Sequence, residues 1–166
     1  MVAVKESGKV TLFTRNGSIV ETLPTIVKTL EESPYDDFVL DGEIMGEDWS
    51  ESASVVMSHK YNKDDSNMIY HVFDAVHIDN WKSQENSTQF SKRHEIAYDI
   101  VEAVNSKHVK CVRSIKIDNE EQLRQYYLKY LDQGYEGVML KDPNAYYVWK
   151  RSKAILKLKQ IGRAHV

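Results

Sequence analysis

The chain has 166 residues, which is enough for one domain with a buried core. Apolar residues make up 42% and charged residues 28%, an ordinary composition for a soluble globular protein. An apolar run of about 18 residues would indicate a membrane span, and the sequence contains neither such a run nor a signal-peptide pattern after Met1. The single Cys111 cannot form an internal disulfide and fits a reducing compartment, so we expect a cytoplasmic protein.

The distribution of charge is more informative than the net charge of −3, which argues against a uniformly basic nucleic-acid binder. From Lys150 onward the chain contains six basic residues and no acidic one, so the rest of the chain carries a net charge of −9. This asymmetry indicates that an anion is bound near the C-terminal end. A basic strand that only faces solvent would show the same pattern.

The first half of the sequence predicts strands connected by short turns and helices. In chain order we expect two strands joined by a turn at Ser7–Gly8, a short helix from Pro24, a strand over 38–45, a short helix over 50–60 and a strand over 69–78. The strand over 38–45 contains an Asp-Gly pair, although this pair more often marks a turn.

The second half predicts two longer helices and three strands. We expect a polar loop over 79–87, a helix over 88–104, a strand over 109–117, a helix from an Asp118 N-cap to Gln133, and strands over 136–141 and 154–160. Asp118 and Glu121 have the spacing of a capping box, and Gly134 is placed to end the helix. This order favours an α+β fold with mixed or antiparallel sheets and flanking helices.

Chemistry-bearing residues gather in short clusters: TRNG (14–17), LDGE (40–43), HVFD (71–74), and EGVMLK (136–141) with KLK (157–159). Each cluster alone is a weak signal, because most residues of a sheet simply pack or face solvent. Their order and spacing across residues 2–160, however, resemble the nucleotidyltransferase domain of ATP-dependent DNA ligases, with the phage-type enzymes closest. The resemblance implies an ATP-grasp-like adenylation fold, and it extends to the helix start FSKRHEI (90–96).

The residue types in these clusters suit a bound ATP. The predicted ATP-binding residues are Arg15, Glu43, Phe73, Arg151, Lys157 and Lys159, and the predicted metal ligands are Glu43 and Glu136. An aromatic ring can stack on adenine, arginine forks suit phosphate or ribose-adjacent oxygens, and two carboxylates suffice for Mg²⁺, which keeps several waters. Lys157 and Lys159 share a strand face and can both reach the α-phosphate.

The strand 136–141 is expected to lie buried between layers, with its ends lining the nucleotide cleft. Glu136 would then serve the metal, and Lys141 would serve the phosphates or an acidic partner. Lys141 is the weaker assignment, because a lysine at the end of a strand can equally reach water.

The resemblance implies three reaction steps: a lysine forms lysyl-AMP from ATP, AMP moves to the 5′-phosphate of a DNA nick, and the 3′-hydroxyl closes the nick. The family's nucleophilic lysine lies in a K-x-D-G motif that the sequence lacks, and Lys5 in VKES does not match it. We therefore interpret residues 1–160 as a partial adenylation domain without the nucleophilic-lysine strand, truncated at both ends, with the OB-fold domain absent. Residues 161–166 (IGRAHV) resemble a reading frame of a sequencing adapter and are interpreted as a non-native tail.

The partners implied by the resemblance are ATP, Mg²⁺ and nicked duplex DNA, in replication, repair or recombination, with no membrane. We expect a monomer, located in the host cytoplasm if the source is a virus. His71 and His77 are expected on one strand face as structural residues, and no histidine has the spacing of a zinc site. Two alternatives stay open: an RNA ligase or mRNA-capping nucleotidyltransferase, and a non-catalytic nucleotide-binding module.

Overall fold

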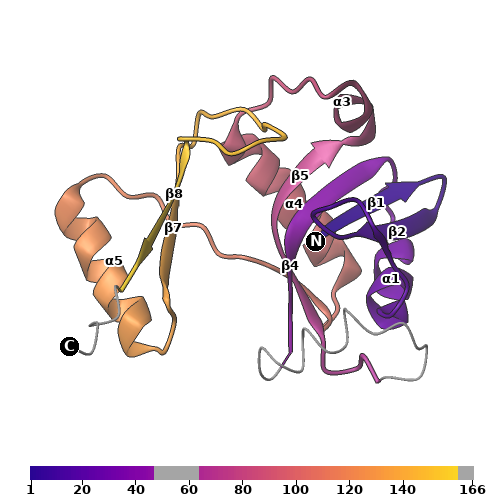
Figure 1. The fold of residues 1–166 in the computed structure, drawn as a ribbon, viewed down its shortest axis with the longest axis horizontal. Helices are drawn as coiled ribbons and strands as arrows, with labels where there is room; N and C mark the ends of the chain where they lie inside the picture. Colours follow the sequence, from indigo (N-terminus) through magenta and orange to yellow (C-terminus); the bar gives the residue numbers. More distant parts are fainter. Residues whose placement is uncertain (47–63, 161–166) are drawn as a thin grey trace.

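The computed structural model describes residues 1–46 and 64–160 and contains two β-sheets flanked by helices (Figure 1). The strands are β1 (Val2–Glu6), β2 (Lys9–Phe13), β3 (Ile19–Val20), β4 (Phe38–Met45), β5 (Ile69–His77), β6 (Val109–Cys111), β7 (Gly137–Lys141) and β8 (Ile155–Lys159). The helices are α1 (Pro24–Glu31), α3 (Ile78–Ser83), α4 (Phe90–Val104) and α5 (Glu120–Asp132). The helix predicted over 50–60 and the tail 161–166 lie outside the described residues.

The larger sheet has six strands in the order β3-β2-β1-β4-β5-β6. Its strands pair antiparallel except for β5 and β6, which are parallel. β7 and β8 form a separate antiparallel pair, and α5 lies on the side of this pair that is turned away from the larger sheet (Figure 1). The prediction of an α+β fold with a mixed sheet is confirmed.

The first hairpin follows directly from its turn residues. Ser7 and Gly8 both have positive φ angles, 51° and 77°, as a two-residue type I′ turn requires. The Gly8 amide also donates to the Asp36 carboxylate, at 3.0 Å from Oδ2. This contact ties the turn to the segment that enters β4.

Both ends of α1 are capped by residues from other parts of the chain. Pro24 occupies the first turn, where a missing N–H has no cost, and the Asp65 carboxylate accepts from the Thr25 amide and hydroxyl at 2.9 and 2.7 Å. At the other end, the buried Lys5 donates its Nζ protons to the carbonyls of Glu31 (3.1 Å) and Ser33 (2.8 Å). Lys5 therefore satisfies free carbonyls of the helix end and points into the core side of the sheet.

The core lies on one face of the six-stranded sheet, under α1 and α4. Its largest fully buried side chains include Leu12, Ile26, Leu30, Leu40 and Tyr70. The Tyr70 hydroxyl donates to the Leu40 carbonyl at 2.9 Å, and burial raises the pKa of this phenol well above its ordinary value. On the opposite face of the sheet, Val39 of β4 and Val76 of β5 are register partners and are also buried.

A β-bulge in β5 changes which side chains share a face. Asp41 pairs with Asp74 while Gly42 pairs with Val72, so Phe73 has no partner on β4. Because His71 pairs with Glu43 and His77 pairs with Phe38, the two histidines lie on opposite faces. The prediction that they share a face is wrong, since strict alternation fails at a bulge.

Other predictions differ from the structure at element ends, and the predicted polar loop over 79–87 contains most of helix α3 (Ile78–Ser83). The strand predicted over 109–117 stops at Cys111, and the α5 N-cap is Asn119, whose side chain accepts from the Gln122 amide at 2.9 Å. The prediction that the strand 136–141 is buried between layers is wrong, because β7 is only partly buried and β8 is exposed throughout. Within the described ranges, no helix has the length and apolar character needed to cross a membrane.

Candidate functional site

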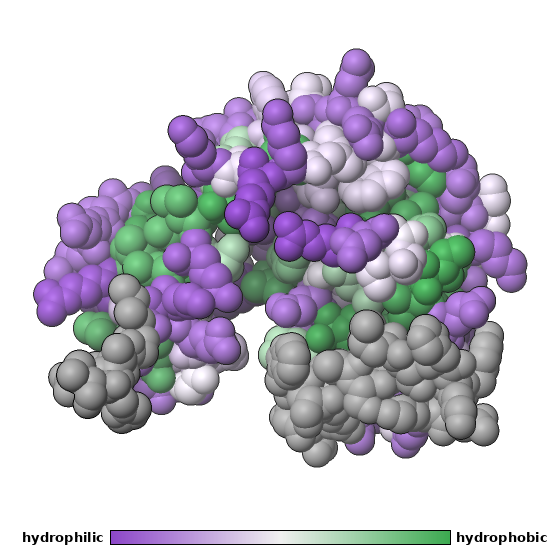
Figure 2. Space-filling view, in the orientation of Figure 1, coloured by the Kyte–Doolittle hydropathy of each residue, from purple (hydrophilic) through white to green (hydrophobic). Residues whose placement is uncertain are grey.

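The two sheets face each other across an open cleft. On the larger sheet, Glu43 of β4 and His71 of β5 point to the same side because they are register partners. On the smaller sheet, Met139 pairs with Lys157 and Gly137 pairs with Lys159, so these residues share one face. In Figure 2 the surface is hollowed between the side that carries α5 and the side that carries β1 and β2.

Lys141 and Phe73 join the two walls of the cleft. The Lys141 ammonium lies 4.6 Å from the Phe73 ring centroid and 4.5 Å from the Phe90 ring centroid, close enough for cation–π attraction. Burial lowers the pKa of Lys141, an effect that the nearby Asp74 and Asp41 charges oppose. Lys141 therefore faces an aromatic and acidic environment and does not extend into water.

The smaller sheet brings two predicted site residues together. Lys157 Nζ lies 3.9 Å from Glu136 Oε2, in a pair whose side chains are 55% and 86% exposed. Such an exposed pair contributes little to stability and can separate when a ligand arrives. Gly137 has φ +156°, and a Cβ there would lie 2.8 Å from the Lys159 Cα, so only glycine allows this close strand approach.

The two predicted arginines lie on irregular segments. Arg15 is exposed in the turn between β2 and β3, which is closed by the Thr14 amide donating to the Ser18 carbonyl at 2.8 Å. Arg151 is exposed in the connection between β7 and β8. Both side chains are free to reach an anion from these positions, and neither is held in place by the fold.

Sequence reasoning missed a buried polar network at one end of the cleft. Arg93 of α4, which is 4% exposed, donates from Nε to Asp74 Oδ1 at 2.8 Å and from Nη2 to Oδ2 at 3.2 Å. The Tyr147 hydroxyl donates to Asp41 Oδ2 at 2.8 Å. Burial is the largest influence on Asp41 and raises the pKa of its carboxyl. The signals for this network in the sequence are Asp41 in LDGE, Asp74 in HVFD and Arg93 in FSKRHEI.

The carboxylates of Glu43 and Glu136 have the chemistry that Mg²⁺ prefers, since it binds oxygen ligands and retains water. Both side chains are exposed, on opposite walls of the cleft. Among residues 1–46 and 64–160, no group of three or more His, Cys, Asp or Glu side chains is arranged to hold a metal ion. In the described residues these two carboxylates therefore belong to no preformed metal cluster, and Glu43 lies in the larger sheet whereas Glu136 directly precedes β7 of the smaller one.

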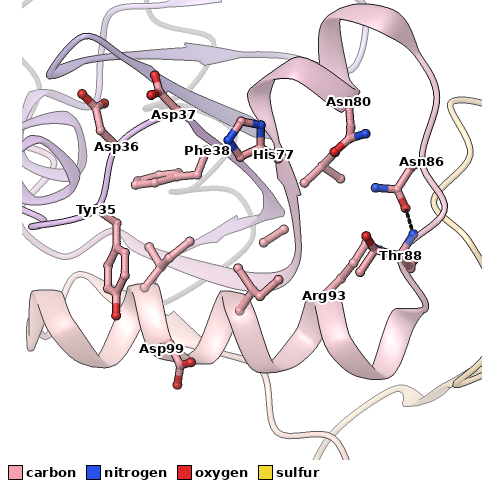
Figure 3. Close-up of a pocket in the computed structure, with 14 residues that line it drawn as sticks. Tyr35, Asp36, Asp37, Phe38, His77, Asn80, Asn86, Thr88, Arg93 and Asp99 are labelled. Carbon is pink, nitrogen blue, oxygen red and sulfur yellow. Dashed lines mark hydrogen bonds between the residues drawn. The ribbon is translucent and has the colours of Figure 1, made fainter.

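A second hollow, of about 290 Å³, lies between the start of β4, the end of β5 and α4. Figure 3 shows Tyr35 and Phe38 at one end and Asn86, Thr88 and Arg93 at the other. Three aspartates border it, and the Arg93 charge is already paired with Asp74. Because carboxylates repel phosphates, this hollow does not suit a nucleotide.

The sequence profile of the ATP dependent DNA ligase domain matches residues 1–159, and the chain therefore belongs to this family. A DNA ligase of Archaeoglobus fulgidus is 26% identical over 170 aligned residues, which cover 94% of this chain and 29% of the relative. The chain thus spans less than a third of the length of this curated relative.

Two solved viral structures share the fold. The ATP-dependent DNA ligase of bacteriophage T7 in complex with ATP has a TM-score of 0.76 at 16% identity, covering 95% of this chain and 57% of that one. The Chlorella virus DNA ligase-adenylate has a TM-score of 0.69 at 23% identity, covering 96% and 59%. The expected adenylation-domain fold is confirmed. The relatives are archaeal as well as viral, so a phage-type enzyme stays a prediction.

Proposed function

We propose that this chain is the nucleotide-binding part of an ATP-dependent DNA ligase that seals nicks in duplex DNA, with ATP and Mg²⁺ bound in the cleft between the two sheets. The observation that carries the proposal is the cleft itself: an aromatic ring and a carboxylate on one wall face lysines and a carboxylate on the other. The family match over residues 1–159 supports the same conclusion.

Each predicted residue has a proposed task. Phe73 stacks on adenine, and Lys157 and Lys159 neutralise charge that develops on the α-phosphate during transfer. Arg15 and Arg151 contact phosphate or ribose-adjacent oxygens, and Glu43 and Glu136 hold Mg²⁺.

In the proposed reaction a lysine nitrogen attacks the α-phosphorus of ATP, the bond to the bridging oxygen breaks and pyrophosphate leaves. AMP then passes to the 5′-phosphate at a nick, and the 3′-hydroxyl displaces AMP as it closes the strand.

Lys5 is an unsuitable nucleophile because it is 2% exposed and donates to two carbonyls on the core side of the sheet. Since the 166 residues contain no K-x-D-G motif, we propose that the nucleophile is supplied from outside this sequence.

Incubation of the chain with labelled ATP and Mg²⁺ tests this assignment. We expect no covalent, lysine-linked AMP on the chain, and its appearance would contradict the proposal. In the full-length ligase, Glu43→Ala or Lys157→Ala should abolish nick sealing, and near-normal sealing would remove that residue from the site. Competition between ATP and GTP distinguishes an ATP-dependent DNA ligase from a capping nucleotidyltransferase, which would prefer GTP.

A further inference from the structure

The segment 142–149, the first part of the connection from β7 to β8, forms the N-terminal cap of α4. The α4 N-cap residue Gln89 makes no side-chain capping bond, although the first amides of a helix have no partner within it. Here the Phe90 amide donates to the Ala145 carbonyl at 2.8 Å, and the Ser91 amide donates to the Pro143 carbonyl at 3.0 Å. The cap therefore comes from a segment about fifty residues further along the chain.

Arg93 connects this segment to β5. While Nε and Nη2 bind both oxygens of Asp74, Nη1 donates to the Ala145 carbonyl at 2.8 Å and to the Thr88 carbonyl. A guanidinium can do this because its donors lie in a fixed planar fork, whereas a lysine has a single nitrogen. Asp74 directly follows Phe73 in the chain. Because Arg93 binds both Asp74 and the Ala145 carbonyl, it connects the segment to the wall of the cleft that carries Phe73.

Tyr147 connects the segment to β4. Its hydroxyl donates to Asp41, and its ring lies 5.6 Å from the Arg93 guanidinium carbon and 5.0 Å from the Trp149 ring centroid. Burial raises the pKa of Tyr147 far above its ordinary value, so the phenol stays a hydrogen-bond donor at any physiological pH.

These contacts matter because the two sheets do not pair with each other. In the described part of the chain, the strand order of the larger sheet ends at β3 and β6, and β7 pairs with β8. Sheet hydrogen bonds therefore leave the width of the cleft undetermined. The segment begins directly after Lys141, so its attachment determines where that lysine lies.

We propose that Arg93 and Tyr147 are positioning residues, which fix the β7–β8 pair relative to the six-stranded sheet and so set the distance between Lys141 and Lys157 on one wall and Phe73 on the other. The effect on nucleotide affinity rests on the proposed function, whereas the geometric effect does not.

A distance measurement between spin labels tests the proposal directly. Nitroxides are attached at exposed positions Lys9 of β2 and Arg124 of α5 in a Cys111→Ser background, and distances are measured by double electron–electron resonance. The test variants are Tyr147→Phe, which removes one hydroxyl, and Arg93→Lys, which keeps a cation beside Asp74 but lacks the fork. Tyr98→Phe, on an exposed part of α4, is the matched control.

The unsubstituted chain and Tyr98→Phe should give the same narrow distance distribution, and both test variants should shift or broaden it while circular dichroism shows a folded chain. Parent-like distances in folded Tyr147→Phe and Arg93→Lys would overturn the proposal. If Arg93→Lys fails to fold, Tyr147→Phe decides, because it keeps the ring and its packing.

The second readout is ATP affinity, which misplacement of the cleft walls should weaken by roughly tenfold or more. Parent-like affinity in a variant with a changed distance would refute the effect on binding. No ATP binding by the unsubstituted chain would instead refute the proposed function, and the distance measurement would still decide the geometry.

Discussion

Replacing Lys5 with methionine should destabilise the fold while leaving the cleft in place. Lys5 is 2% exposed, and its ammonium donates to the Glu31 and Ser33 carbonyls at the C-terminal end of α1. Methionine retains the apolar stem and leaves both acceptors without this donor. A hydrogen bond to a charged group contributes about 1.5–3 kcal/mol, so we expect a loss of about 2–4 kcal/mol in the free energy of unfolding after partial relaxation.

Urea denaturation followed by circular dichroism measures this loss. With an m-value of about 2 kcal/mol/M, the midpoint should fall by about 1–2 M and the m-value should stay constant. Lys9→Met is the matched control, because Lys9 is an exposed lysine of the neighbouring strand, and its effect should stay within about 0.5 kcal/mol. A Lys5→Met midpoint equal to that of Lys9→Met would refute the capping role.

Three further predictions concern the strands around the cleft. Gly42→Ala should lower the free energy of unfolding by about 1–3 kcal/mol, because a Cβ there would meet the His71 carbonyl and lie 2.7 Å from the Tyr70 ring. Thermal unfolding measures this loss, and an unchanged melting temperature would contradict the close packing. Burial raises the folded pKa of Asp41 above 3.8, so this carboxyl binds protons more readily in the folded state than in the unfolded state. The contribution of Asp41 to the free energy of unfolding therefore falls as pH rises from 3.8 through the raised pKa. Asp41→Asn should remove this contribution from a pH–stability profile, and an unchanged slope would contradict this cause. Burial raises the pKa of Cys111 to about 11, which lowers the fraction of reactive thiolate in the folded chain. Iodoacetamide at pH 8 should therefore alkylate the folded chain about tenfold more slowly than the urea-unfolded chain. Equal rates would contradict the burial.

Local signals in the sequence were sufficient for most of the elements. Ser7–Gly8 is a turn because both residues accept positive φ, and Pro24 opens α1 because its fixed φ suits a first helical turn. The shared face of Lys157 and Lys159 follows from strand alternation alone. These features depend on residues that are neighbours in the chain.

Features that depend on distant partners could not be predicted. The bulge at Phe73 exists only in the register between β4 and β5. The Arg93–Asp74 pair joins residues 19 positions apart, and the Tyr147–Asp41 bond joins residues 106 positions apart. Residues 112–117 alternate like a strand, but β6 is the last strand of its sheet and the chain leaves the edge after Cys111.

Direct binding of ATP tests the central claim, which is that the cleft between the two sheets is a nucleotide site. Isothermal titration of the chain with ATP and Mg²⁺ should give saturable binding with one site per chain. Phe73→Ala should weaken it by about 1–3 kcal/mol through lost stacking, and Lys157→Met should also weaken it, while Lys153→Met and Tyr35→Ala, beside the second hollow, should not. Absence of binding, or binding that is insensitive to Phe73→Ala and Lys157→Met, would contradict the account.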